Sequence, residues 1–366
     1  MCHKGVTSSP FLHREGGPLR GCFASFRRGF SFSQLLPRPD SPLNHLEIPA
    51  RSHIDGDGAG GTTGYFSPRH SFLQDPAFPI TLASAERLIF FIDSAILSIA
   101  EGPTWEVTDP APSEILDTLA HEFQHMIHFY QKDILQDVVS EVWLNEMASE
   151  VTTDLIADKL RIPGPRGVAS NDPTAGAPGN TDGRLPRYNA NNFRQVTAWR
   201  NELADYSITY ALGAYLARTY GVGLFREIVQ NDRAGVDAIE AALASQGHSV
   251  SFADVLTNWA IANLLSDDTS TPDPYRYDSG IWFTSAVGGQ TFRLGSINLF
   301  NYRYREPGHP LDGWDGPWFW PLTNFNALPA QLPHSNLYVT VGRTSGTVRL
   351  RINAPTGNRI TVVVKE

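Results

Sequence analysis

The chain has little cysteine and no long apolar run, and each shortage excludes a class of protein. Its two cysteines, Cys2 and Cys22, lie in a segment without the patterns of a folded domain. A disulfide framework or a thiolate metal site is therefore not indicated, and a metal would have to be held by histidine and carboxylate side chains. The longest apolar stretch, 88–100, is interrupted by Asp93 and falls short of the roughly 18 apolar residues that a membrane helix needs. We expect no integral membrane segment.

Positive charge is also scarce, because the net charge is -9 at pH 7. A sequence-independent nucleic-acid binder needs a basic surface that neutralises phosphates, so no nucleic-acid partner is expected. The first 40 residues contain several arginines but no apolar run of the length that a secretory signal requires, and they predict no signal peptide. We interpret the arginines as part of a solvated N-terminal arm.

Composition divides the 366 residues into three parts. Residues 1–60 are rich in Gly, Pro, Ser and Arg and predict a flexible segment, in which Asp55 and Asp57 fit a plain turn better than a calcium loop. Residues 61–270 show the regular spacing of a folded domain. Residues 275–366 change to short alternating segments, which predict a C-terminal β domain.

Helices dominate the predicted middle domain. Pro112-Ser113-Glu114 provides a capping serine and a first-turn acid before the first helix. A long segment at 161–188, rich in Gly, Pro, Asn and Asp, predicts a loop that is either functional or disordered. Apolar residues at helical spacing predict helices at about 113–132, 137–160, 203–220, 222–231, 234–246 and 251–266.

Strands are predicted at both ends of the helical region. Leu88–Asp93 is a short apolar run rich in β-forming residues, which indicates a buried or edge strand. Beyond the helices, alternating segments predict strands at 281–284, 336–341, 347–352 and 360–364. The fold class that follows is α+β, with a C-terminal domain like a small β-sandwich.

The strongest chemical signal is H-E-F-Q-H at 121–125, which reads H-E-x-x-H and falls within a predicted helix. Histidines at positions i and i+4 project from one face of a helix, so the nitrogens of His121 and His125 can converge on one zinc ion. Glu122 lies too far around the helix to be an easy third ligand. It is close enough to act on a water at the metal, which predicts a general base.

A second acidic pattern, W-L-N-E-M-A-S-E at 143–150, lies on the next predicted helix. A catalytic zinc takes three protein ligands and leaves one position for water. Glu146 follows His125 by 21 residues, enough for a turn and a returning helix to bring its carboxylate to the same ion. Glu150 lies one helical turn further along, where it can accept the free N–H of a liganding histidine. We predict Glu146 as the third ligand and Glu150 as the residue that orients a histidine.

A competing geometry takes the third ligand from the same helix. Metzincins place a glycine three residues after the second histidine and a third histidine six residues after it. This chain has His128 and Gln131 at those positions. His128 would stand about 4–5 Å further along the axis than a shared metal, so we interpret it as a packed or surface histidine.

Taken together, H-E-x-x-H and N-E-x-x-S-E resemble the gluzincin metallopeptidases, the class that contains thermolysin and the zinc aminopeptidases. The segments that look like those of the hyicolysin-like peptidases, within residues of about 60–270, are 64–68, 84–93, 143–150 and 251–263. The resemblance implies a thermolysin-like catalytic domain at 61–270, with a small mixed or antiparallel sheet and a mainly helical lower half. It also implies a Zn²⁺ cofactor, a peptide or protein substrate and an extracellular or periplasmic location.

The resemblance also implies a residue that stabilises the oxyanion. The segment 205–221 looks like the zinc-aminopeptidase helix that begins with such a tyrosine, which selects Tyr206, with Tyr210 as the second choice. A core aromatic on an amphipathic helix is the alternative for either residue. One departure is that no G-x-M-E-N segment, whose glutamate binds a substrate amine in the aminopeptidases, precedes residue 121. Endopeptidase activity is therefore favoured over aminopeptidase activity.

Two other functions remain open at this point. A non-catalytic carbohydrate- or protein-binding module could use an aromatic cluster near the C-terminus, although such clusters are more often core than ligand platforms. A zinc hydrolase acting on another substrate has the same site chemistry. No pattern indicates an oligomeric state. The aromatic cluster consists of Trp314, Trp318, Phe319, Trp320 and Phe325.

Overall fold

The computed structural model describes residues 63–92, 110–277, 281–284, 291–321, 331–340 and 356–364. Three predictions lie outside these ranges: the flexible segment at 1–60 with its turn, the strand at 347–352, and Phe325 in the aromatic cluster. The chain divides into two units, Met1–Leu135 with Asn201–Leu203, and Gln136–Arg200 with Ala204–Glu366. Each unit is described by itself.

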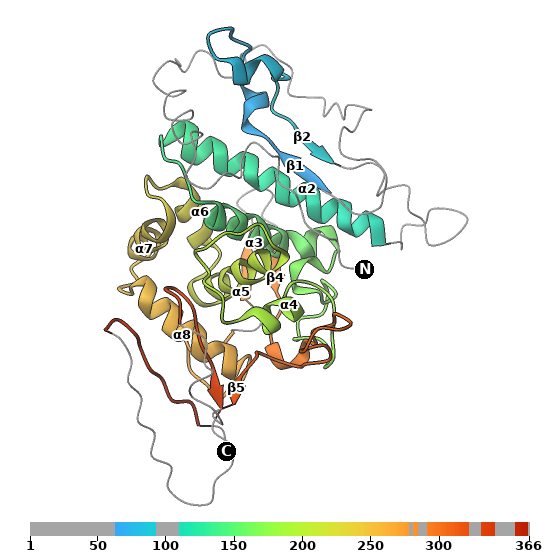
Figure 1. The fold of residues 1–366 in the computed structure, drawn as a ribbon, viewed down its shortest axis with the longest axis vertical. Helices are drawn as coiled ribbons and strands as arrows, with labels where there is room; N and C mark the ends of the chain where they lie inside the picture. The colour runs from blue at the N-terminus through green and yellow to red at the C-terminus, as the bar shows by residue number, and fades with distance from the viewer. Residues whose placement is uncertain are drawn as a thin grey trace, which may run out of the picture. The chain divides into compact units, whose positions relative to one another are not determined.

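In the first unit, a two-stranded antiparallel sheet packs against one long helix (Figure 1). Strand β1 (Gly64–Phe66) pairs with β2 (Phe90–Ile92), and Tyr65 lies opposite Phe91. Both strands contact helix α2 (Pro110–His128). The 3-10 helices η2 (Pro68–Ser71) and η3 (Pro79–Ala83) separate the strands. The strand predicted at Leu88–Asp93 is thereby confirmed as β2.

Helix α2 confirms the first predicted helix but divides its apolar residues between two sides. Ile115 on α2 and Phe129, the first residue after it, are buried, whereas Phe123 is half exposed. Phe123 follows His121 by two residues, so it lies on the far side of the helix from the two histidines of the motif. The helix continues as a π-helix, η5 (Phe129–Leu135), a geometry that is often found at functional sites.

The second unit is mainly helical. Five of its helices match the sequence predictions, although α3 begins five residues later than expected. Helix α4 and the 3-10 helix η6 (Gly164–Arg166) were not predicted, since their residues belong to the Gly/Pro-rich loop or follow it. The α-helices are α3 (Val142–Leu160), α4 (Leu185–Asn191), α5 (Leu203–Tyr220), α6 (Gly223–Gln230), α7 (Gly235–Ser245) and α8 (Phe252–Leu265).

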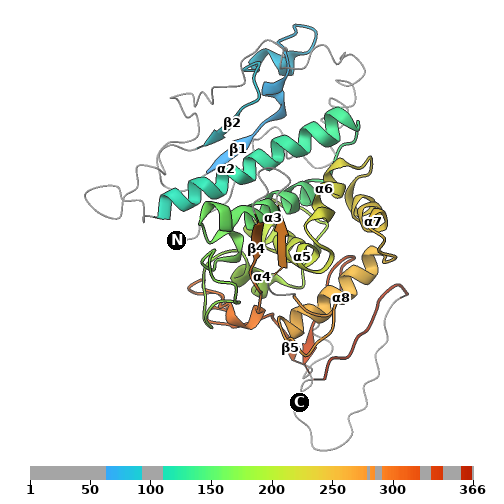
Figure 2. The same ribbon diagram turned by 180° about the vertical axis from the view of Figure 1, so that it is seen from behind.

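Helices α3 and α5 form the centre of the second unit (Figure 2). Every residue of α5 from Ala204 to Arg218 is buried. Gly213 allows the close approach, because a Cβ atom there would lie 2.4 Å from Cγ2 of Val151 and 2.9 Å from Cγ of Met147 on α3. Neither helix shows a one-sided apolar pattern, as expected for helices buried on nearly all sides. None of the helices in the described ranges combines the length and hydropathy of a membrane span.

The β-sandwich predicted for the C-terminal region is not seen in the part of that region that the structure describes. Strands β3 (Ile281–Thr284) and β4 (Thr291–Leu294) form an antiparallel pair, and β5 (Trp320–Pro321) pairs in parallel with β6 (Val339–Thr340). Residues 360–364 form no strand, and within the described part of 281–364 there are only these two small sheets. The alternating segments instead cover the helices: β4 packs on α3, and the core shared with the helices includes Leu294, Ile297, Leu299 and Tyr302.

A charged pair lies buried in this core. Nη1 of Arg218 donates to Oδ2 of Asp154 at 2.9 Å, and Nε of Arg218 donates to the carbonyl oxygen of Gly295 at 2.9 Å. The side chains are 0% and 4% exposed. Because an ionised group in a core is costly unless it is paired and hydrogen-bonded, the two residues depend on each other. The pair joins α5 to α3 and to the segment that follows β4.

Replacing Arg218 should therefore destabilise the protein strongly. Arg218→Met leaves the carboxylate of Asp154 buried and unpaired, and we expect the free energy of unfolding to fall by about 3–5 kcal/mol. Urea unfolding followed by far-UV circular dichroism measures the change. Arg226→Met is the control, since Arg226 is 70% exposed and pairs with its neighbour Glu227; it should behave like wild type. Equal unfolding midpoints for the two variants would contradict the role of the buried pair.

Candidate metal centre

The two histidines of the motif stand side by side on α2. The rings of His121 and His125 have centroids 4.7 Å apart at an interplanar angle of 80°. This follows from the helix itself, because residues four apart lie on one face and their side chains neighbour each other. Both residues are intermediate in exposure, so their ring nitrogens are positioned by the helix without being sealed in the core.

Glu146 completes a group that could hold a metal ion. His121, His125 and Glu146 each offer one ligand atom, and these atoms all lie within 4.8 Å of one another. Two imidazole nitrogens and one carboxylate oxygen are a donor set of catalytic zinc sites. A tetrahedral zinc with ligand distances of about 2.0–2.2 Å separates its donor atoms by roughly 3.5 Å, which side-chain rotation can reach from this arrangement. The residues fit zinc.

Helix α3 fixes the backbone of Glu146 by burying the residues around it. Trp143, Leu144 and Met147 are 3%, 0% and 0% exposed, and they anchor the first two turns of the helix in the core of the second unit. Glu146 itself is intermediate in exposure. The carboxylate is thus carried by a well-packed helix while remaining accessible, which is the combination that a metal ligand requires.

Two neighbouring residues of α2 differ in what they can contribute. Glu122 follows His121, a residue of the group, in the sequence. Its side chain is 6% exposed, so its carboxylate is held in a largely desolvated position. His128 is 1% exposed and is not part of the metal-binding group found among the described residues. This burial agrees with its interpretation as a packed histidine, whereas Gln131, the other metzincin position, lies in the π-helix.

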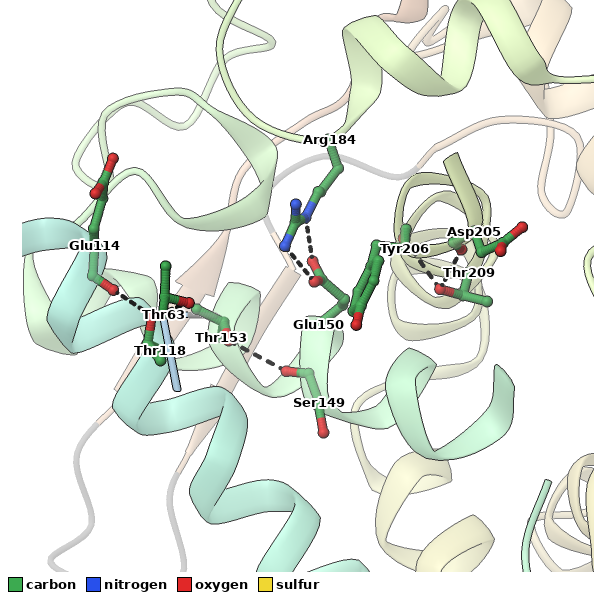
Figure 3. A network of polar contacts seen from close by, with 10 residues as sticks. All are labelled: Thr63, Glu114, Thr118, Ser149, Glu150, Thr153, Arg184, Asp205, Tyr206 and Thr209. Carbon is green, nitrogen blue, oxygen red and sulfur yellow. Dashed lines mark hydrogen bonds and ion pairs between the residues drawn. The ribbon is translucent and has the colours of Figure 1, made fainter. Parts of the chain in front are cut away.

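Glu150 has a partner that the sequence did not indicate. Nε of Arg184 donates to Oε2 of Glu150 at 2.9 Å, and Nη2 donates to Oε1 at 2.7 Å (Figure 3). The carboxylate is 3% exposed, so this two-pronged pair compensates a buried charge. Each carboxylate oxygen has two lone pairs, and the predicted bond from a histidine remains compatible with the pair. That second role stays a prediction.

The two tyrosine candidates occupy different surroundings on α5. Tyr206 is 6% exposed, with the guanidinium carbon of Arg184 5.4 Å from its ring centroid and the ring of Trp199 4.8 Å away. Tyr210 is 0% exposed, and its hydroxyl has no hydrogen-bond partner in the described part of the chain. Burial, and then the charge of Asp154, raise the pKa of Tyr210 well above its ordinary value. The side chain of Tyr210 is thus enclosed in the core of the second unit.

The C-terminal aromatic cluster packs on itself. Trp314 and Trp318 have ring centroids 4.9 Å apart at 67°, and Trp318 and Trp320 have centroids 6.0 Å apart at 78°. Phe319 contacts Tyr338 at a similar angle. Edge-to-face contacts of this kind are typical of aromatic packing. The geometry favours a structural role for the cluster.

Comparison with known families decides the class of the protein. A family model described as Peptidase M30 matches residues 12–280, well over half of the chain. The chain belongs to the peptidase M30 family. The resemblance to the hyicolysin-like peptidases is thereby confirmed, because this is the hyicolysin family. Membership makes the protein a zinc metallopeptidase that hydrolyses peptide bonds in a protein substrate. No protein with a curated description matches the chain.

The sequence predicted the three residues of the group that could hold a metal ion, but it did not indicate Arg184. The histidines and Glu146 could be found because helical spacing and a short connection restrict where their side chains lie. Arg184 follows Gly183 in a bend of the chain, in a segment without a periodic pattern. Gly183 has a φ of +76°, and a Cβ there would lie 2.5 Å from the carbonyl oxygen of Pro165. The glycine was the one local signal that this loop is built closely against another segment.

Removing the carboxylate of Glu146 should weaken zinc binding. Glu146→Gln replaces an anionic ligand by a neutral amide. We expect zinc affinity to fall by at least about tenfold, because a loss of that size is typical even when a residue that only hydrogen-bonds to a zinc ligand is replaced. Competition with a chelator, followed by elemental analysis, measures it. Glu141→Gln is the control, because Glu141 is exposed and lies at the N-cap of the same helix, five residues before Glu146. Unchanged zinc affinity in Glu146→Gln would mean that the third ligand is another residue.

Proposed function

We propose that this peptidase is an endopeptidase with a thermolysin-like gluzincin site, in which His121, His125 and Glu146 bind zinc and Glu122 is the general base. The single observation that carries the assignment is the grouping of the three ligand atoms within 4.8 Å of one another. Glu122 is the residue next to the first histidine and has the carboxylate that peptide hydrolysis requires.

In the proposed reaction, the residues of the chain move a proton and stabilise a developing charge. A bound zinc ion would act as a Lewis acid that polarises the scissile carbonyl and makes water more acidic. The carboxylate of Glu122 accepts a proton from the attacking water and delivers it to the nitrogen of the leaving amine. The phenol of Tyr206 donates a hydrogen bond to the oxygen that becomes negative at the attacked carbonyl.

Tyr206 is the better oxyanion donor for a physical reason. A donor must reach the substrate, and Tyr210 is fully enclosed by the core, with Asp154 and Arg218 among its electrostatic partners. Tyr206 lies beside Arg184, whose side chain is 31% exposed. Arg184 in turn binds Glu150, which lies one helical turn from Glu146 on α3. Asp154, the electrostatic partner of Tyr210, lies two helical turns from Glu146.

Two further statements belong to the proposal. Endopeptidase rather than aminopeptidase activity is supported by the lack of a G-x-M-E-N segment before residue 121, since a site without that glutamate has no dedicated partner for a free substrate amine. An extracellular or periplasmic location is supported by family membership. The domain limits of 61–270 for the catalytic part and 275–366 for the remainder stay predictions.

Glu122→Gln should separate metal binding from turnover. The amide keeps the size of the side chain but cannot accept a proton, so zinc content should match wild type while kcat falls by a factor of about 10³ or more. A peptide-library digest read by mass spectrometry reports the loss, and in the wild type it reports whether cuts lie inside the peptides. Glu114→Gln, an exposed change near the start of the same helix, is the control. Full turnover in Glu122→Gln would remove the proposed mechanism.

The two tyrosines make opposite predictions. Tyr206→Phe removes a donor to the developing oxyanion, and kcat should fall by about 10²–10³ with little change in KM. Tyr210→Phe removes a buried hydroxyl without a partner, so kcat should be retained and the melting temperature should stay equal or rise. Steady-state kinetics and thermal unfolding of both variants test this. A loss of kcat in Tyr210→Phe alone would reverse the assignment.

A further inference from the structure

Arg184 occupies a position between two helices of the second unit. Its backbone is fixed on both sides, because its N–H donates to the carbonyl oxygen of Pro165 at 2.8 Å and its own carbonyl accepts from the N–H of Tyr188 at 3.1 Å. Its side chain leaves this anchor and reaches Glu150 on α3 and the ring of Tyr206 on α5 (Figure 3).

The contact with Glu150 orients the guanidinium group. Two parallel hydrogen bonds, at 2.9 and 2.7 Å, hold the fork of Arg184 in the plane of a carboxylate that is only 3% exposed. A single hydrogen bond would leave the fork free to rotate, whereas two fix its plane and direction. Glu150 belongs to the same helix as Glu146, so α3 defines where the guanidinium lies.

The contact with Tyr206 links the oriented guanidinium group of Arg184 to α5. The guanidinium carbon lies 5.4 Å from the centroid of the Tyr206 ring, within the range of a favourable cation–π contact. The ring of Trp199 meets Tyr206 at 4.8 Å and an angle of 74°. The phenol ring is thus bounded by a cation and an indole, and its own rotation is restricted.

We propose that Arg184 is a positioning residue that holds the phenol of Tyr206 at a fixed place relative to α3, the helix that carries Glu146. The inference rests on the proposed function, in which Tyr206 donates a hydrogen bond to the oxyanion. Such a donor is effective only when it is already in place, because a displacement of about 1 Å can cost two orders of magnitude in rate. Arg184 supplies that constraint without touching the substrate.

Arg184→Met and Arg184→Lys test the proposal. Methionine keeps the length of the side chain but removes the charge and the hydrogen bonds, and kcat should fall by about 10- to 100-fold with KM within about twofold. Lysine keeps the charge beside Glu150 but lacks the planar fork, so its kcat should fall nearly as far. A role of the positive charge alone would leave Arg184→Lys close to wild type, which would overturn the proposal. The lysine variant decides the question if the methionine variant does not fold.

A double-mutant cycle with Tyr206→Phe gives the decisive readout. If Arg184 acts through the phenol, Arg184→Met should lower kcat less than about threefold in a chain that already carries Tyr206→Phe. A merely structural role of Arg184 would produce the same loss in both backgrounds. Zinc content and melting temperature are measured for all variants, so that a loss of metal or fold is recognised.

The chain contains a matched control for the arginine change. Arg187 pairs with Glu306 at 3.6 Å, and its guanidinium carbon lies 5.8 Å from the ring centroid of Tyr304. The chemistry repeats that of Arg184, with a carboxylate on one side and a tyrosine ring on the other, but here the carboxylate and the ring belong to residues 304–306 instead of α3 and α5. Arg187→Met should keep kcat close to wild type.

The outcomes distinguish the inference from the proposed function. Equal losses from Arg184→Met in both backgrounds, or wild-type kcat in Arg184→Met, would overturn the positioning role and leave the function of Glu122 and Tyr206 intact. Full activity of Tyr206→Phe would overturn the assignment of the oxyanion donor and the inference with it. Full activity of Glu122→Gln would overturn the proposed mechanism as a whole.

Discussion

Three carboxylates along α3 each require a positive partner, and the second unit is arranged to meet that requirement. Glu146, Glu150 and Asp154 follow one another at intervals of four residues on one side of a helix that is buried on most of its surface. Unpaired, they would repel one another and resist burial. Arg184 compensates Glu150, Arg218 compensates Asp154, and the zinc ion of this family fits Glu146 together with two histidines. The two arginines come from a loop and from α5, so charge compensation ties distant segments to the helix that carries the site.

Much of this arrangement could be predicted from the sequence, because it depends on local spacing. Helices α5 to α8 begin and end within a few residues of their predicted limits, since apolar periodicity and turn residues mark both ends. The three residues of the metal-binding group could be predicted for the same reason: two share one helix face and the third follows on the next helix. The strand at Leu88–Asp93 was also found from its composition.

What could not be predicted depends on contacts between distant segments. Alternating apolar residues in the C-terminal region indicated a sheet with its own core, but alternation does not show what a strand packs against. In the structure, Leu294, Leu299 and Tyr302 pack among the helices, so the strands stay in pairs. Arg184 was missed because its role arises from a bend at Gly183 and from partners 34 and 22 residues away.

The shared core has a consequence for dividing this protein. The family match ends at residue 280, and the last α-helix in the described ranges ends at Leu265, which would suggest a self-contained peptidase domain that stops before strands β3 to β6. Yet Arg218 donates to the carbonyl oxygen of Gly295, Asn189 donates to those of Leu299 and Tyr302, and Tyr302 is wholly enclosed. A chain cut at the family boundary would open the centre of the second unit to water. The smallest piece that keeps α3 in its present surroundings therefore extends past Tyr302.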